Sequence, residues 1–136
     1  MLARRQILIV LSLGMTLWLV FTLAIRWTPF LFDQGLLNAL LYLVSLPAAW
    51  LLVSLIGRVA GLAETELLSG IALAICAASL CDGIGVAWFS TLYGSDPDHH
   101  RLGAAYILWG AGVFLLIALI RSQRAMRHTG DSPPLS

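Results

Sequence analysis

A single carboxylate, Asp82, lies within the apolar run AICAASLCDGIGVAWF of residues 74–89. Placing an Asp at the centre of a membrane helix costs about 2.5–3.5 kcal/mol on insertion scales, so such residues face the protein or a wet cavity. Two chemical states are open for Asp82. Without a cation nearby, desolvation favours the neutral acid, which could bind and release a proton. Beside an arginine, it would stay ionised as half of an ion pair.

Polar side chains at a similar depth are predicted to surround this acid. Tyr42 and Ser45 lie one turn apart on the second apolar segment, and therefore on one helix face. Thr22 near the end of the first segment and Tyr106 near the start of the fourth complete the predicted cluster. Two arginines flank the same side of the membrane and are the predicted ion-pair partners of the acid, namely Arg26 and Arg101.

Small residues and a proline are expected to shape the packing. Gly70, Ala74 and Ala78 precede Asp82 at intervals of four, a stripe typical of close helix contact. Pro47 cannot donate the helical hydrogen bond and is predicted to kink the second helix, either as plain shape or as a hinge. The glycines of WGAGVF are predicted to be packing sites and not a gate; they are Gly110 and Gly112.

Neither the cysteines nor the histidines predict a redox or metal site. Cys76 and Cys81 form no Cys-x-x-Cys motif. They point about 140° apart on a helix, so they are interpreted as packing residues. The loop SDPDHHR holds two acids and two adjacent histidines without further ligands at recognisable spacing, and a solvated polar turn is expected. We expect no metal and no cofactor.

The composition identifies the elements that must position these groups. Of 136 residues, 60% are hydrophobic and 11% are charged, and the mean hydropathy is +0.90. Such values are typical of an integral membrane protein. Four segments reach the roughly 20 apolar residues that cross a bilayer. They predict an all-α membrane domain over residues 1–120, an up-down-up-down antiparallel bundle with spans at about 7–25, 36–56, 67–93 and 102–120. Residues 121–136 are expected to form a polar, partly disordered tail.

Arginine placement predicts the orientation of the bundle. Basic residues are enriched in cytoplasmic segments. Six of the eight arginines fall on one predicted side and only Arg26 and Arg101 on the other, so both termini are expected in the cytoplasm; the six are Arg4, Arg5, Arg58, Arg121, Arg124 and Arg127. The aromatic residues that end the third span are expected at the outer interface, where such side chains anchor helices; they are Trp88, Phe89 and Tyr93.

Four stretches, TLAIRWTPF, SLPAAWLL, CDGIGVAWF and AYILWGAGVF, together resemble the domain of unknown function 5367 family of small bacterial membrane proteins. The resemblance covers about Gln6 to Ile120. It implies a four-span protein of the bacterial inner membrane. It carries over no catalytic or binding residues.

Two classes of function are therefore predicted. The first is a non-enzymatic protein with an accessory or packing role, whose partners would be the lipid bilayer and either itself or another membrane protein. A net charge of +1 argues against a nucleic-acid partner. The alternative is a small oligomeric transporter coupled to protons or cations through Asp82. In size the chain is similar to the small multidrug resistance exporters, although their acid lies in the first span and this first span has none.

A third class, an enzyme acting on lipids or quinones, is disfavoured because such enzymes gather several polar groups and this chain embeds one acid. The structure can discriminate between the first two. A closed bundle with Asp82 paired to arginine would favour a structural role. An outward cavity that reaches Asp82, or a two-fold interface around it, would favour transport.

Overall fold

Four long helices make up most of the chain in the computed structural model, which describes residues 2–32, 35–93 and 96–130. They are α1 (Arg4–Trp27), α2 (Leu36–Ala60), α3 (Leu67–Trp88) and α4 (Pro97–Gly130). Three short 3-10 turns accompany them: η1 (Pro29–Leu31), η2 (Glu64–Glu66) and η3 (Ser90–Tyr93). All four helices are long and apolar enough to cross a membrane. The predicted all-α, four-span fold is confirmed, and the chain is a multi-pass membrane protein.

Local chemistry explains where the helices begin and end. Pro29 enters the 3-10 turn η1 at its first position, where its missing N–H costs nothing. Gly61 follows α2 with φ of 62°. This left-handed conformation is one that glycine adopts without strain. Asp96 precedes α4, and its carboxylate accepts a hydrogen bond from the His99 backbone N–H at 3.2 Å. With Pro97 as the first helical residue, this is an ordinary helix start.

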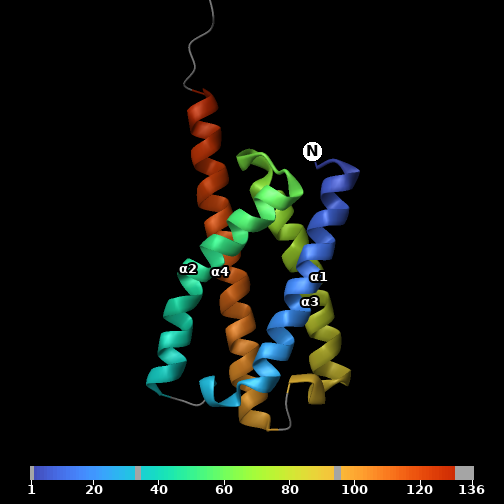
Figure 1. Ribbon diagram of the computed structural model, residues 1–136, viewed down its shortest axis with the longest axis vertical. Coiled ribbons are helices and arrows are strands. Elements are labelled where there is room, and N and C mark those ends of the chain that lie inside the picture. The colour runs from blue at the N-terminus through green and yellow to red at the C-terminus, as the bar shows by residue number, and fades with distance from the viewer. Residues whose placement is uncertain (1, 33–34, 94–95, 131–136) are drawn as a thin grey trace, which may run out of the picture.

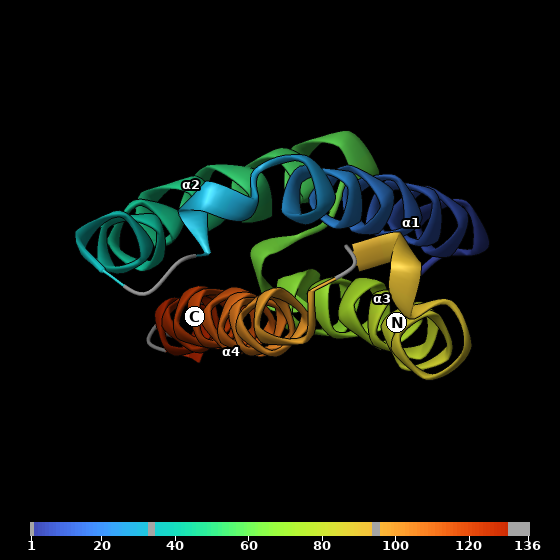
Figure 2. The ribbon, with the colours of Figure 1, turned by 90° about the horizontal axis from the view of Figure 1, so that it is seen from below.

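The helices form two layers (Figures 1 and 2). Figure 2 shows α1 and α2 side by side above α3 and α4. Contacts are most extensive between α1 and α3, while α2 packs mainly on α4 and α3 also packs on α4. Although α2 and α3 are consecutive in the chain, they meet only slightly. The expectation that all consecutive helices are close neighbours is therefore wrong for this pair, which lies diagonally across the bundle.

The main cluster of buried apolar residues lies toward the end of the bundle that holds the N-terminus. Here the buried core contains Val10, Val53, Ile56, Ala60, Leu67, Ile71, Ala74 and Ala118. Gly14 of α1 lies directly against Ala74 of α3, so that a Cβ added at Gly14 would be 3.1 Å from Ala74. The predicted small-residue stripe thus includes a real close contact between helices.

The observed third and fourth helices differ from the predicted spans. The third span ends at Trp88, and η3 carries the chain on to Tyr93. The fourth helix continues through the basic segment as far as Gly130, so the expected tail begins as helix, and residues 131–136 lie outside the described residues. Pro47 lies inside a continuous α2, which changes direction partway along its length (Figure 1).

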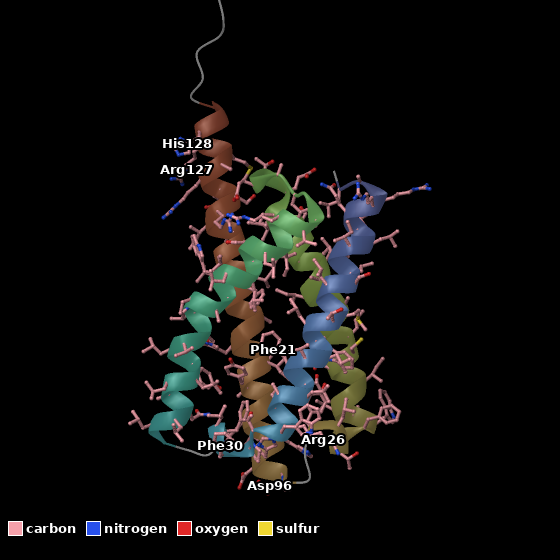
Figure 3. The ribbon with its side chains drawn as sticks, viewed as in Figure 1. Phe21, Arg26, Phe30, Asp96, Arg127 and His128 are labelled. Carbon is pink, nitrogen blue, oxygen red and sulfur yellow. The ribbon has the colours of Figure 1, made fainter. Side chains whose placement is uncertain are left out.

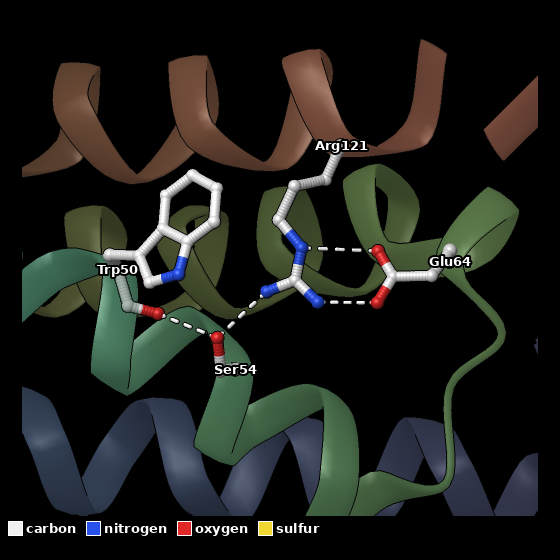
Figure 4. Close-up of polar contacts among 4 residues, drawn as sticks. All are labelled: Trp50, Ser54, Glu64 and Arg121. Atoms are coloured by element: carbon white, nitrogen blue, oxygen red, sulfur yellow. Dashed lines mark hydrogen bonds and ion pairs between the residues drawn. The ribbon is translucent and has the colours of Figure 1, made fainter. Parts of the chain in front are cut away.

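Arg121 connects α4 to two other elements near the end of the bundle that holds the N-terminus (Figure 4). Its Nε donates to Glu64 Oε2 of η2 at 3.1 Å, its Nη2 pairs with Glu64 Oε1, and its Nη1 donates to Ser54 Oγ of α2 at 2.8 Å. The guanidinium also lies 5.5 Å from the Trp50 ring centroid. Its side chain is only 19% exposed, so this contact is protected from full solvent screening.

Arg121→Met should lower the free energy of unfolding by about 1–2 kcal/mol, because it removes charged hydrogen bonds. Glu64 stays half exposed in this variant and keeps its solvation, which limits the loss. Reversible unfolding in mixed micelles, followed by circular dichroism, would measure it. Arg124, an exposed residue one turn further along α4, provides the matched control. Arg124→Met should change stability by less than about 0.5 kcal/mol. Equal losses for both variants would contradict a stabilising role for the Arg121 contacts.

Candidate functional site

Asp82 is held by two neutral donors from different parts of the chain. Trp18 of α1 donates its indole Nε1–H to Asp82 Oδ1 at 2.8 Å, and Tyr93 of η3 donates its hydroxyl to the same oxygen at 2.6 Å. Within the described residues, the second oxygen, Oδ2, has no hydrogen-bond donor. The carboxylate is therefore held in place through Oδ1, and Oδ2 is available to contact a bound ligand.

The short turn η3 explains how Tyr93 reaches back to Asp82. Because α3 ends at Trp88, the chain folds back and Tyr93 becomes almost fully buried, with 3% of its surface exposed. Gly85 leaves room for the ring, since a Cβ at that position would be 2.9 Å from the tyrosine oxygen. Burial, reinforced by the adjacent Asp82, raises the pKa of Tyr93 to about 12. Tyr93 therefore remains protonated and acts as a donor.

The structure gives other partners to both arginines that were expected near the acid. Arg26 donates from Nη1 to the backbone carbonyl of Thr91 at 3.0 Å. Arg101 lies 3.7 Å from Asp98, one turn away on the exposed start of α4. Among the described residues, then, the donors that reach Asp82 are an indole and a phenol, and neither carries a positive charge.

A cavity of about 150 Å³ lies between the two layers, and Asp82 is part of its wall. All four helices contribute to the lining, which is mostly apolar. The polar residues of the lining are Trp18, Thr22, Ser45, Ser79, Asp82 and Tyr106. Four of the five residues of the predicted polar cluster, all except Tyr42, thus line one cavity.

Those cluster residues do not form a single hydrogen-bond network. Ser45 accepts a hydrogen bond from Trp109 Nε1 at 3.0 Å and donates to the Tyr42 carbonyl at 2.6 Å, within the α2–α4 contact. Tyr42 and Tyr106 meet edge to face, with ring centroids 5.4 Å apart. The predicted cluster therefore separates into an acid centre at Asp82 and an aromatic contact between α2 and α4.

Trp18 is a residue of the candidate site that the sequence interpretation missed. It lies four residues before Thr22 on α1, so both side chains face the same side of that helix and line the cavity. A tryptophan that is at least partly buried usually finds an acceptor for its N–H, which is the signal that could have identified it. Tyr93 was expected only as an interface aromatic.

The histidine and cysteine interpretations have mixed outcomes. His99 was expected in a solvated turn, but it is buried, and its Nε2 lies 2.9 Å from the Ile25 carbonyl. That expectation is wrong because Asp96 and Pro97 start a helix here and turn His99 inward. Cys76 and Cys81 are both free thiols, and Cys81 contacts Met15 of α1. Within the described residues, no group of three or more potential metal ligands occurs.

The two glycines of α4 do not mediate close packing. A Cβ added at Gly110 or Gly112 would meet no atom within 4 Å. Gly110 instead lines the cavity, where its missing side chain adds space. The prediction that both are packing sites is wrong, because the helix contacts of α4 are made by other residues, such as buried Gly103 against Ile25.

Comparisons with known proteins leave the site without an assigned role. A family model described as Family of unknown function (DUF5367) matches residues 30–125, a range that includes Asp82 and Tyr93 and begins after Trp18. No curated protein and no solved structure matches the chain.

Proposed function

The chain belongs to the Family of unknown function (DUF5367), a description that assigns no activity, and we propose that it is a non-enzymatic membrane protein whose cavity binds a small, mainly apolar cation beside Asp82. The observation that carries this proposal is a carboxylate in an apolar cavity wall with one oxygen left without a protein donor. Among the described lining residues, Asp82 is the only one with a formal charge.

Charge is the feature that would select the ligand. At an effective dielectric constant near 20, an opposite charge 4 Å away gains about 4 kcal/mol. Aromatic rings near the acid also favour a cation, because their faces carry negative potential. The lining holds four aromatic side chains, of which Trp18 contacts Asp82 directly; the others are Phe21, Tyr106 and Phe114. A neutral molecule of the same size would gain neither contribution.

The size of the cavity limits the ligand. An apolar cavity of about 150 Å³ holds a molecule close to benzene in size. We therefore choose benzylammonium as the probe, with benzyl alcohol as a neutral molecule of nearly the same shape. Both carry one ring, which suits the apolar walls, and they differ in the charge that Asp82 would meet.

Benzylammonium should bind saturably to the protein in lipid nanodiscs, and Asp82→Asn should weaken that binding by at least about tenfold, equivalent to about 1.4 kcal/mol. Benzyl alcohol should bind both proteins within about threefold, since it makes no use of the charge. Isothermal titration calorimetry would measure both ligands. Gly110→Leu should weaken both, because the added side chain enters the cavity. The proposal would be overturned if benzylammonium did not bind the wild-type protein, or if the Asp82→Asn variant bound it as tightly as the wild type does.

A non-enzymatic role is supported by the chemistry of the wall. The polar groups beside Asp82 are hydroxyls and an indole, and among the described lining residues none is His, Cys, Lys or Arg. One carboxylate with fixed neutral donors supplies charge and orientation. Transport coupled to protons or cations is the second candidate, because a carboxylate without an arginine partner can exchange a proton for a cation. A second copy of the chain, or another membrane protein, would complete such a pathway.

We place the protein in a bacterial inner membrane with both termini in the cytoplasm. Figure 3 shows Arg127 and His128 at one end of the molecule and Arg26 and Asp96 at the other. The end with Arg127 also holds the N-terminus (Figure 1), which supports the predicted bias of arginines toward one side.

C-terminal fusions would test this orientation. A fluorescent protein that matures only in the cytoplasm should be bright on the full chain, and alkaline phosphatase at the same position should be inactive. Moving the fusion to a site after Trp27 should reverse both results. Strong phosphatase activity at the C-terminus would reject the orientation.

A further inference from the structure

We propose that the ligand enters the cavity sideways from the bilayer, between α1 and α2, and is therefore a membrane-partitioned amphiphile with a cationic head and an apolar tail. This inference rests on the proposed function and deepens it by naming the class of ligand. It follows from where the cavity is closed and where its lining is exposed.

The outer end of the cavity is closed by a buried layer. Tyr93 and Thr22 are 3% and 1% exposed and lie beside Asp82. Beyond them, His99 bonds to the Ile25 carbonyl and meets the Phe32 ring edge to face at 5.4 Å. All of these side chains are buried. A polar molecule arriving from water at this end would have to displace them.

The inner end is closed by the main core. Ile56 and Ile71 form part of the cavity lining and are themselves almost fully buried. They belong to the cluster that continues through Val53 and Ala118 toward the N-terminal end of the bundle. No aqueous route along the bundle axis is therefore evident among the described residues at either end.

Part of the cavity lining is exposed on the sides of the helices. Phe21 of α1 and Ala48 of α2 line the cavity and are also exposed. Figure 3 shows Phe21 at the edge of α1 that is nearer α2 in this view. These helices are neighbours in one layer (Figure 2), so the two residues mark a mouth between them. Since both helices span the membrane, this mouth faces lipid.

The layer formed by α3 and α4 has fewer exposed residues in the cavity lining. Ser79 of α3 also lines the cavity and is exposed, but none of the described lining residues of α4 is exposed. An opening between α3 and α4 would therefore be lined on one side only. We assign the mouth to α1 and α2 on this difference.

A lateral mouth allows the ligand to have an apolar tail that extends outside the cavity. The charged head would sit at Asp82, while a tail could pass between Phe21 and Ala48 and remain among lipid chains. Lipid tails are as apolar as leucine, so the tail would gain or lose little on binding. A cavity closed on its sides would instead exclude any ligand much larger than benzene.

The test compares benzylammonium with 4-hexylbenzylammonium in lipid nanodiscs, with concentrations expressed per mole of lipid. The two should bind the wild-type chain within about threefold of each other. Ala48→Trp should weaken binding of the hexyl compound at least about tenfold more than binding of benzylammonium, because the indole would fill the mouth, which only the hexyl tail has to occupy. Leu43→Trp, at an exposed α2 residue outside the cavity lining, is the matched control and should affect neither compound. Ala48→Ser, the conservative variant at the same position, and Ser79→Trp, on the other layer, should leave the ratio of the two affinities unchanged.

The outcomes separate the two proposals. If benzylammonium binds and the hexyl compound does not, the cavity has no lateral mouth and only this inference fails. If Ser79→Trp, and not Ala48→Trp, excludes the hexyl compound, the mouth between α1 and α2 is wrong. If neither compound binds the wild-type chain, the proposed function fails and this inference with it.

Discussion

Asp82→Leu should lower the free energy of unfolding by about 2–4 kcal/mol, because it leaves two donors without an acceptor at about 1–3 kcal/mol each. The Tyr93 hydroxyl and the Trp18 indole both depend on Asp82 Oδ1. Thr22 lies within hydrogen-bond reach of Tyr93, so its hydroxyl can replace Asp82 as the acceptor for the tyrosine hydroxyl, which limits the loss. Reversible unfolding in mixed micelles would measure the change.

Asp82→Asn should be much milder, with a loss of about 1 kcal/mol, because its amide oxygen can still accept from both donors and only the charge assistance is lost. Adding Tyr93→Phe to Asp82→Leu should recover about 1 kcal/mol, since it removes one unsatisfied donor. Arg101→Gln serves as the additive control, because its ion pair is with exposed Asp98. A loss from Asp82→Asn as large as that from Asp82→Leu would mean that the negative charge itself holds the helices together.

This pair of variants also separates structure from function. If the charge were retained for stability, removing it would cost stability and nothing else. In the folded chain its two hydrogen bonds need an acceptor and not a charge. We therefore expect the Asp82→Asn variant to keep the fold and to bind the cation much more weakly.

The four spans could be predicted from the sequence because their signal is spread over many residues. A segment of about 20 apolar residues has few alternatives to a membrane helix, whatever its neighbours are. The end of the third helix could not be predicted in the same way, since it depends on only a few residues after Gly85. The apolar run continues to Tyr93, and hydropathy does not register that the chain leaves the helix at Trp88.

The partners of Asp82 could not be predicted for a related reason. Arginines were expected because charge attracts charge, but side-chain contact depends on which helix faces which. Trp18 reaches Asp82 because α1 packs on α3 across the layers. Tyr93 reaches it because η3 reverses the chain over Gly85. Both are contacts of tertiary structure, and neither residue spacing nor composition encodes them directly.

Gly14→Leu should destabilise the protein by about 3 kcal/mol, at the upper end of the usual cost of overpacking a close contact. Even a Cβ at this position would be 3.1 Å from the Ala74 Cα, Cβ and carbonyl oxygen. Two of these atoms belong to the backbone, so relief requires α1 and α3 to move apart. Gly14→Ala should cost less, about 1 kcal/mol, because a single carbon needs a smaller shift.

Gly112→Leu is the matched control. The same substitution on α4 meets no atom within 4 Å at its Cβ. Leucine is also a better helix former than glycine by up to about 1 kcal/mol. The variant should leave stability unchanged or slightly improved. The difference between the two leucine variants then measures the close approach of α1 and α3, free of the general effect of replacing a glycine.

The Gly14 variants should also report on the cavity. Trp18 lies one turn beyond Gly14 on the same helix, and its bond to Asp82 crosses the same α1–α3 contact. Separating these helices would lengthen that bond and enlarge the cavity, so Gly14→Leu should weaken benzylammonium binding as well as stability. Normal binding by a destabilised Gly14→Leu protein would show that the cation needs the Asp82 carboxylate but not its positioning by Trp18.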